Sequence, residues 1–305
     1  MIPAARSMLH PRIVRTAVYL LIAIVAIVAL FGLRVVALSF WYERADYVRT
    51  PPAAITGHPE RTAIAGLHEI SFIDSIGTRL AGWYAPSGNG AAVVLVHGTG
   101  ADRSSLLLET GFLADAGFGV LAIDLPGQGA SGGRTRWGVP ERRAISAAVD
   151  WLSARPDVDP RRIGGFGSSM GAYVMTQAAV LDPRLRSVVL AASPNEVVEQ
   201  NWLATRRWGL LSQLPNYLAL RAYGQSLDMA PKDVIGRIAP RPVFILGGDL
   251  DELVPKFMAL QLYAAAGDPK ELWIVPGAHH VDYGRVAEDE YRRRVVDFFV
   301  RTLLN

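Results

Sequence analysis

Eight short apolar runs, most of them separated by stretches of helical periodicity, constrain the fold of this chain more than any other feature. The runs are His68–Ile73, Leu80–Ala85, Val93–Val96, Val120–Ile123, Ile163–Phe166, Val188–Ala191, Val243–Leu246 and Leu272–Val275. From the third run onward the helical stretches are Ser104–Ala116, Pro140–Ala154, Met170–Leu181, Pro255–Ala266 and Glu288–Leu304. This alternation predicts an α/β fold with a mostly parallel, eight-stranded sheet covered by helices on both faces. A short connection joins the first two runs, so we expect them to form an antiparallel hairpin at one edge.

An uncharged apolar segment precedes these runs. Residues 16–33 carry no charge, and their length is at the threshold for crossing a bilayer of about 30 Å. Residues 34–40 extend the segment, with Arg34 reaching toward headgroups and Trp41 and Tyr42 suited to the interface. We expect an N-terminal flank over 1–15, a transmembrane anchor over 16–40, a Pro- and Gly-rich juxtamembrane linker over 41–66 and the α/β domain over 67–305.

Two alternatives compete with the anchor. A cleaved signal peptide would have a shorter apolar region and a cleavage site of small residues, and a buried core helix would carry polar positions. Arg6, Arg12 and Arg15 precede the segment, while Arg34, Arg44 and Arg49 nearly balance them on the other side. We favour a single-pass protein of the inner or cell membrane, with the remainder of the chain outside the cytoplasm.

Composition excludes several function classes. The net charge is only +3, and no basic run alternates with aromatic residues, so we expect no nucleic-acid partner. The chain contains no cysteine, which excludes disulfides, a thiolate nucleophile and Cys-ligated zinc. No His, Asp and Glu residues occur at a typical metal-ligand spacing, and we expect neither a metal nor another cofactor.

The sequence Gly-Ser-Ser-Met-Gly at 167–171 is the strongest sign of chemistry. It follows one predicted strand and opens a predicted helix, which is the context of a nucleophile elbow. Such a turn requires small residues two positions before and after the serine, because the chain folds closely on itself there. Gly167 and Gly171 meet that requirement for Ser169 and not for Ser168. The helix N-terminus also offers a free backbone N–H at Met170, where an oxyanion would form.

From about His68 to the C-terminus the chain resembles the α/β-hydrolase superfamily, and within it bacterial membrane-anchored serine hydrolases of the esterase and peptidase type. The matching blocks occur in the family's order: LVHGTGADRS (95–104), AIDLPGQGASGG (122–133), GFGSSMGA (165–172), GGDLDELVP (247–255) and VPGAHHVD (275–282). They resemble, in turn, the oxyanion loop, the segment after the next strand, the elbow, the acid loop and the histidine loop. The order of the blocks is more specific than any single block.

The resemblance implies the remaining members of a Ser-Asp-His triad. Asp251 occupies the acid's position in the Asp-x-x-Val-Pro frame, and its competitor Asp249 is expected to shape the turn after Gly248. The histidine loop aligns His280 with the catalytic base in preference to His279.

The same resemblance implies the oxyanion hole and its supports. The Met170 N–H would be one donor and the Thr99 N–H the second, with Gly100 as the alternative. We expect His97, Asp124 and Glu141 to brace loops and take no part in proton transfer. Gln128 stands where relatives often have His, which affects a support residue and leaves the triad intact.

This triad predicts acyl-enzyme chemistry on a small-molecule acyl substrate, and the substrate class stays open. Residues 194–241, here named the cap insert, are expected to form a small helical cap. Their apolar residues suit an acyl chain and equally suit packing of the cap onto the core: Trp202, Trp208, Leu210, Leu211, Leu214, Tyr217 and Tyr223. We favour hydrolysis of carboxylic esters, with lipid-like or amphipathic esters as candidate substrates, over a serine exopeptidase of the prolyl-oligopeptidase type. An acyltransferase or thioesterase is a further alternative, and a non-catalytic binding module is the least favoured.

Overall fold

The computed structural model describes residues 11–44, 59–197, 199, 203, 210–223 and 228–305. Its centre is an eight-stranded mixed sheet in the order β1-β2-β4-β3-β5-β6-β7-β8. The strands are β1 (His68–Ile73), β2 (Arg79–Ala85), β3 (Ala92–Val96), β4 (Gly119–Ile123), β5 (Ile163–Ser168), β6 (Leu185–Ala191), β7 (Val243–Gly248) and β8 (Lys270–Val275). The pairs from β4 across to β8 are parallel, whereas β1 pairs with β2, and β2 with β4, in antiparallel register. The predicted sheet and its edge hairpin are therefore confirmed.

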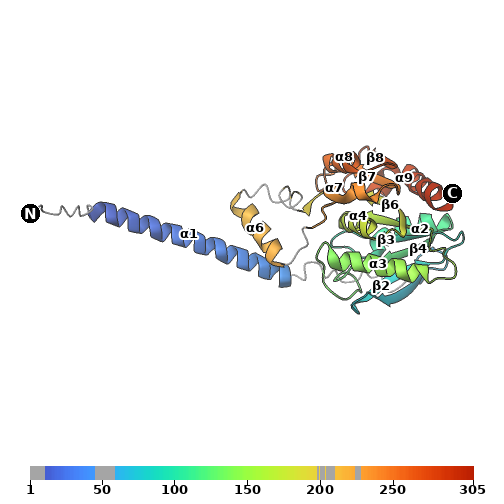
Figure 1. Cartoon of the computed structure of the whole chain (residues 1–305), viewed down its shortest axis with the longest axis horizontal. Coiled ribbons are helices and arrows are strands. Elements are labelled where there is room, and N and C mark those ends of the chain that lie inside the picture. Colours follow the sequence, from blue (N-terminus) through green and yellow to red (C-terminus); the bar gives the residue numbers. More distant parts are fainter. Residues whose placement is uncertain (1–10, 45–58, 198, 200–202, 204–209, 224–227) are drawn as a thin grey trace, which may run out of the picture.

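Helices cover both faces of the sheet (Figure 1). They are α2 (Leu107–Asp115), α3 (Val139–Ser153), α4 (Met170–Leu181), α7 (Pro231–Val234), α8 (Lys256–Ala265) and α9 (Tyr283–Phe299). Short 3-10 helices, η2 (Pro59–Arg61), η3 (Arg103–Leu106) and η5 (Ile235–Ile238), and a closing π-helix, η6 (Val300–Leu304), complete this part. β3 shows why both faces are buried: Val94 and Val96 belong to the core beneath α3 and α4, and Val93 and Leu95 to the core beneath α2 and α9.

The last helix begins earlier than the sequence predicts. α9 starts at Tyr283, whereas the helical pattern was expected from Glu288. Ala287 has non-helical backbone angles (φ −148°, ψ 50°), and this kink divides α9 into a short first segment and a longer second one. The periodicity resumes only after the kink, because side chains before and after it do not share one helical face.

The N-terminal helix α1 (Pro11–Arg44) lies outside the α/β domain (Figure 1). Its stretch Arg15–Leu38 is long and apolar enough to cross a membrane, a property that a signal sequence shares. At 1.5 Å per residue, these 24 residues span about 36 Å. Residues 45–58, within the predicted linker, lie outside the described residues, whereas the predicted linker's residues 41–44 are the end of α1.

The cap insert leaves and rejoins the domain at one place. Its described helices are α6 (Leu210–Tyr223), α7 and η5, while Trp202 and Trp208 lie outside the described residues. The Lys232 N–H donates to the Asn195 carbonyl oxygen over 3.2 Å, and the Lys232 ammonium pairs with the Glu196 carboxylate. α7 and η5 pack on α4 and α8, whereas α6 packs against α1 (Figure 1).

Candidate active site

Ser169 lies at the sharp turn between β5 and α4. Its backbone is in the left-handed region (φ 53°, ψ −118°), and its N–H donates to the Ala191 carbonyl oxygen over 2.8 Å. An added Cβ at Gly171 would collide with the Val96 carbonyl oxygen, and one at Gly167 would lie 2.5 Å from the Ala172 Cα. Only glycine fits these two positions, which is the local requirement that the five-residue pattern predicted. The turn holds the Ser169 side chain at the carboxyl end of the central strand.

A continuous hydrogen-bond chain joins the three residues of the predicted triad. His280 Nε2 lies 3.0 Å from Ser169 Oγ, and His280 Nδ1 lies 2.8 Å from Asp251 Oδ2. A carboxylate only accepts hydrogen bonds, so the bond to Asp251 places the proton on Nδ1 and leaves Nε2 as the acceptor facing the serine hydroxyl. Ser169, His280 and Asp251 thus stand in the geometry that acyl transfer requires of a nucleophile, a base and an orienting carboxylate.

The loops that carry Asp251 and His280 hold each other in place. Asp251 Oδ1 accepts from the N–H groups of Leu253 (2.9 Å) and Val254 (2.8 Å), which orients the carboxylate. Asp249 Oδ1 accepts from the Gly277 N–H at 2.7 Å, so this competitor ties the two loops together as a turn residue. His279, the alternative base, is exposed, and the distances above belong to His280.

The loop after β3 lies directly beside the nucleophile. An added Cβ at Gly98 would lie 3.7 Å from Ser169 Oγ, which shows how closely this backbone approaches. The Thr99 hydroxyl contacts the Met170 sulfur at 3.1 Å. The Gly100 N–H donates to Gln128 Oε1 at 3.1 Å, so the alternative oxyanion donor already has a partner.

His97 supports this loop from the interior. It is completely buried, its Nε2 accepts from the Leu125 N–H at 3.0 Å, and its Nδ1 donates to the Gly98 carbonyl oxygen at 2.8 Å. Burial lowers the pKa of His97 below its usual value, and the two bonds also require the neutral ring. A neutral, fully bonded imidazole braces the loop and has no free position for proton transfer, as the sequence indicated.

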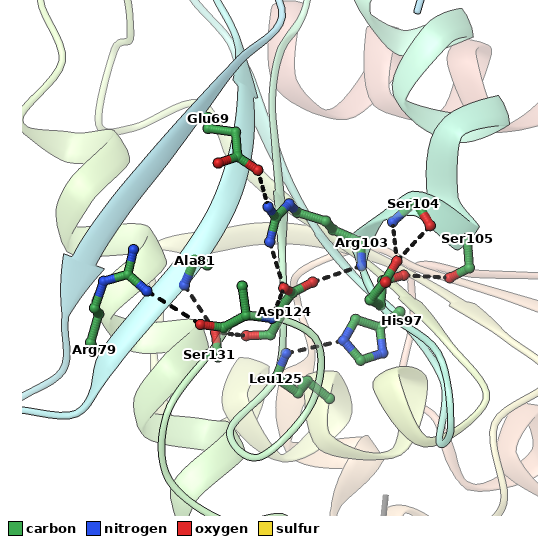
Figure 2. Close-up of polar contacts among 12 residues, drawn as sticks. Glu69, Arg79, Ala81, His97, Arg103, Ser104, Ser105, Asp124, Leu125 and Ser131 are labelled. Carbon is green, nitrogen blue, oxygen red and sulfur yellow. Dashed lines mark hydrogen bonds and ion pairs between the residues drawn. The ribbon is translucent and has the colours of Figure 1, made fainter. Parts of the chain in front are cut away.

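A buried ion pair anchors the end of the same loop, and its cation, Arg103, was not predicted from the sequence. The Arg103 guanidinium pairs with Asp124 and with Glu69 (Figure 2). It also lies 5.3 Å from the centre of the Trp83 ring. Asp124 also accepts from the N–H groups of Arg103 (2.8 Å) and Ala130 (2.7 Å). Arg103 lies within the segment 95–104 that resembles the oxyanion loop, but the sequence does not show that its charge is buried.

Glu141 braces a second loop. Its carboxylate accepts from the N–H groups of Arg136 (2.8 Å) and Gly138 (2.7 Å) at the start of α3. Burial raises the pKa of Glu141, and the bonds to backbone N–H groups oppose that rise. The expected bracing roles of Asp124 and Glu141 agree with these contacts.

Comparison with known proteins places this geometry in a class. The solved esterase Pf2001 from Pyrococcus furiosus is 25% identical, aligns over 78% of this chain and 93% of its own, and has a TM-score of 0.66. The fold and its neighbours define the chain as a serine hydrolase of the α/β-hydrolase superfamily. The family model described as the prolyl oligopeptidase family matches residues 104–305, and the chain belongs to that family.

Two relatives align over most of the chain. The Mycobacterium tuberculosis protein Rv2307c is 33% identical over 88% of this chain and 93% of its own length. A polyketide transferase, ATR5, from Stachybotrys chlorohalonatus is also 33% identical, over 72% of this chain and 92% of its own length. The first alignment reaches beyond the family match, because that match begins only at residue 104.

Proposed function

We propose that the protein is a membrane-anchored carboxylic ester hydrolase in which Ser169, His280 and Asp251 form the catalytic triad. The hydrogen-bond chain from Ser169 Oγ through His280 to Asp251 is the observation that carries this proposal. The likeness to an esterase at 25% identity supports ester cleavage over other acyl chemistry. The apolar stretch Arg15–Leu38 supports the anchor. The arginines at its N-terminal flank, Arg6, Arg12 and Arg15, favour a catalytic domain outside the cytoplasm.

The mechanism follows from the placement of each group. Ser169 Oγ attacks the ester carbonyl while His280 Nε2 takes the hydroxyl proton, and Asp251 stabilises the imidazolium. The carbonyl oxygen becomes an oxyanion, which accepts from the Met170 N–H at the start of α4 and from the Thr99 N–H. His280 then protonates the leaving alcohol. Water, deprotonated by the same ring, attacks the acyl-enzyme and releases the carboxylic acid.

The Thr99 N–H is a better second oxyanion donor than the Gly100 N–H because of the hydrogen bonds within their loop. The Gly100 N–H already donates to Gln128, whereas the part of the chain that the structure describes contains no hydrogen-bond acceptor for the Thr99 N–H. A backbone N–H held beside Ser169 with its bond free is what an oxyanion site requires.

The first experiment tests the nucleophile. We expect a fluorophosphonate probe to label the full-length protein and the Ser168→Ala control, and to leave Ser169→Ala unlabelled. The rate of ester hydrolysis in Ser169→Ala should fall by about 10⁴-fold or more, since removing the nucleophile of a triad has an effect of this order. Labelling that persists in Ser169→Ala would exclude this triad.

The second experiment separates esters from two other acyl substrates. The family description supports a peptidase, and the relative named as a polyketide transferase supports acyl transfer to an acceptor other than water. A chain-length series of p-nitrophenyl esters, a set of aminoacyl-proline anilides and esters with added alcohols should be compared. Faster ester turnover with free acid as the product supports the proposal, whereas faster anilide cleavage or ester exchange supports an alternative.

A further inference from the structure

The helical pair formed by α1 and α6 has its apolar side chains on the outside. Within residues 12–38 of α1, large apolar side chains such as Val25, Val28 and Leu30 are exposed. Among the residues of this stretch whose exposure the structure describes, only Phe31, Val35 and Leu38 are partly covered. Their spacing of four and three residues places them on one helical face. α6 is the element that packs against α1, so this face is where α6 lies (Figure 1).

The helix α6 has the reverse of the polarity expected in water. Its buried side chains include two amides, Gln213 and Asn216, together with Ala219. Its opposite face exposes Leu214 (51%), Tyr217 (36%) and Leu218 (37%). A surface helix of a soluble protein turns its apolar stripe inward and its polar residues outward. Small and polar residues between helices, with leucines outside, are typical of helices that pack within a bilayer.

The position of α6 along α1 agrees with packing of the two helices within a bilayer. The contact lies at the C-terminal end of the apolar stretch, where Phe31 to Leu38 would approach the membrane surface. Tyr217 and the exposed Arg221 lie on the same face as Leu214, and tyrosine and arginine are suited to the headgroup boundary. A single surface can therefore run from the apolar face of α1 onto the face of α6.

We infer that the face formed by Leu214, Tyr217 and Leu218, here named the α6 apolar face, inserts into the lipid bilayer beside α1. This inference rests on the proposed anchor and adds the substrate class, because the cap insert that carries α6 begins just beyond β6. The Ala191 carbonyl oxygen at the end of β6 accepts from the Ser169 N–H. The cap insert therefore departs beside Ser169 and carries a face suited to lipid, which favours esters of membrane-resident amphiphiles as the substrate.

The absence of cysteine from the sequence makes a direct test simple. Single-cysteine variants Leu214→Cys and Leu218→Cys of the full chain are labelled with a fluorophore and reconstituted into phosphatidylcholine–phosphatidylglycerol vesicles. Val25→Cys on α1 is the membrane control. Leu181→Cys, exposed at the C-terminal end of α4, is the water control. Fluorophosphonate labelling of each variant shows that the domain has folded.

We expect nitroxide groups on the lipid acyl chains to quench the probes at 214, 218 and 25 at least twofold, and to leave the probe at 181 unchanged. Aqueous iodide should show the opposite order. If the probe at 25 is quenched by lipid while those at 214 and 218 respond like 181, the inference is overturned and the anchor stands. If the probe at 25 is not quenched by lipid, the anchor fails and the inference fails with it.

Turnover tests the consequence for the substrate. The double substitution of Leu214→Glu with Leu218→Glu should lower hydrolysis of a long-chain ester embedded in vesicles at least tenfold. Hydrolysis of a soluble short-chain ester should stay within twofold, and Leu181→Glu should change neither rate. Equal losses on both esters, or no loss on the embedded one, would contradict a role of the α6 apolar face in reaching membrane esters.

Discussion

The catalytic domain and the α1–α6 pair both bury polar side chains, but they do so in opposite surroundings. In the domain, Asp124 is fully buried, and its carboxylate is bonded by Arg103 and by backbone N–H groups (Figure 2). In the pair, Gln213 and Asn216 are buried while leucines face outward. Burial of a polar group therefore has two consequences in this molecule. In the domain it fixes a loop, and in the pair it supports the inferred apolar surroundings.

Removing the anion of the buried ion pair should have the largest effect on stability. Asp124→Ala leaves the Arg103 guanidinium buried with Glu69 as its remaining partner, so we expect the free energy of unfolding to fall by about 3–5 kcal/mol. Denaturant unfolding measures the loss. Asp115→Ala, at the exposed pair with Arg292, is the control and should leave stability nearly unchanged. Equal effects at both sites would erase the distinction between the buried network and the surface.

Substitution of Gln128 should have the next largest effect, and this effect should be on the catalytic rate and not on stability. Gln128→Leu removes the acceptor of the Gly100 N–H, so the loop that carries Thr99 loses a tie, and we expect kcat to fall roughly tenfold with KM little changed. Gln128→Glu keeps an acceptor at the same place and should retain most of the rate. Steady-state kinetics on a soluble ester measures both. A loss confined to KM would contradict a role in shaping the oxyanion site.

The buried His97 should make the domain sensitive to acid. Because its folded pKa is lowered, the unfolded chain binds the proton more readily, and stability present above the unfolded value of about 6.5 is lost as pH falls below it. The contribution of His97 approaches about 1.4 kcal/mol per pH unit. Denaturant unfolding between pH 7 and 5 should show a shallower slope in His97→Gln than in the parent chain. An unchanged slope in His97→Gln would refute this assignment.

The smallest effect is expected in the helical pair. Polar contacts between membrane helices are worth about 0.6 kcal/mol on average, so Asn216→Ala should destabilise the pair by roughly that amount. Unfolding of the full chain in bicelles, followed by a probe on α6, measures it, with the outward Leu214→Ala as control. A cost close to that of Asp124→Ala would show that α6 lies in surroundings like those of the core.

Most of the fold could be predicted from the sequence because each strand is a short apolar run with clear boundaries. The first residues of α9 were not predicted, since the kink at Ala287 interrupts the helical period. The family resemblance implied Ser169, Asp251 and His280 as a set, and the structure joins these three side chains in one hydrogen-bond chain. The ties from Gln128 to Gly100 and from Arg103 to Asp124 and Glu69 could not be predicted, because they join side chains whose burial depends on tertiary packing.

The contact between α6 and α1 could not be predicted from the sequence either, because no pattern in one helix indicates that it packs against the other. The apolar residues of the cap insert were compatible with an acyl chain or with packing onto the core. In the structure, α6 of the cap insert instead packs against the N-terminal helix α1.

The bond from the Lys232 N–H to the Asn195 carbonyl oxygen has an evolutionary consequence. It closes the cap insert at its base, so the chain enters and leaves this region at neighbouring points while the strands on either side keep their register. A segment attached in this way is a module: it can be lengthened, shortened or grafted from a relative without rebuilding the sheet. Exchange of the cap insert would change the surroundings of Ser169 while the turn that holds this serine is inherited unchanged.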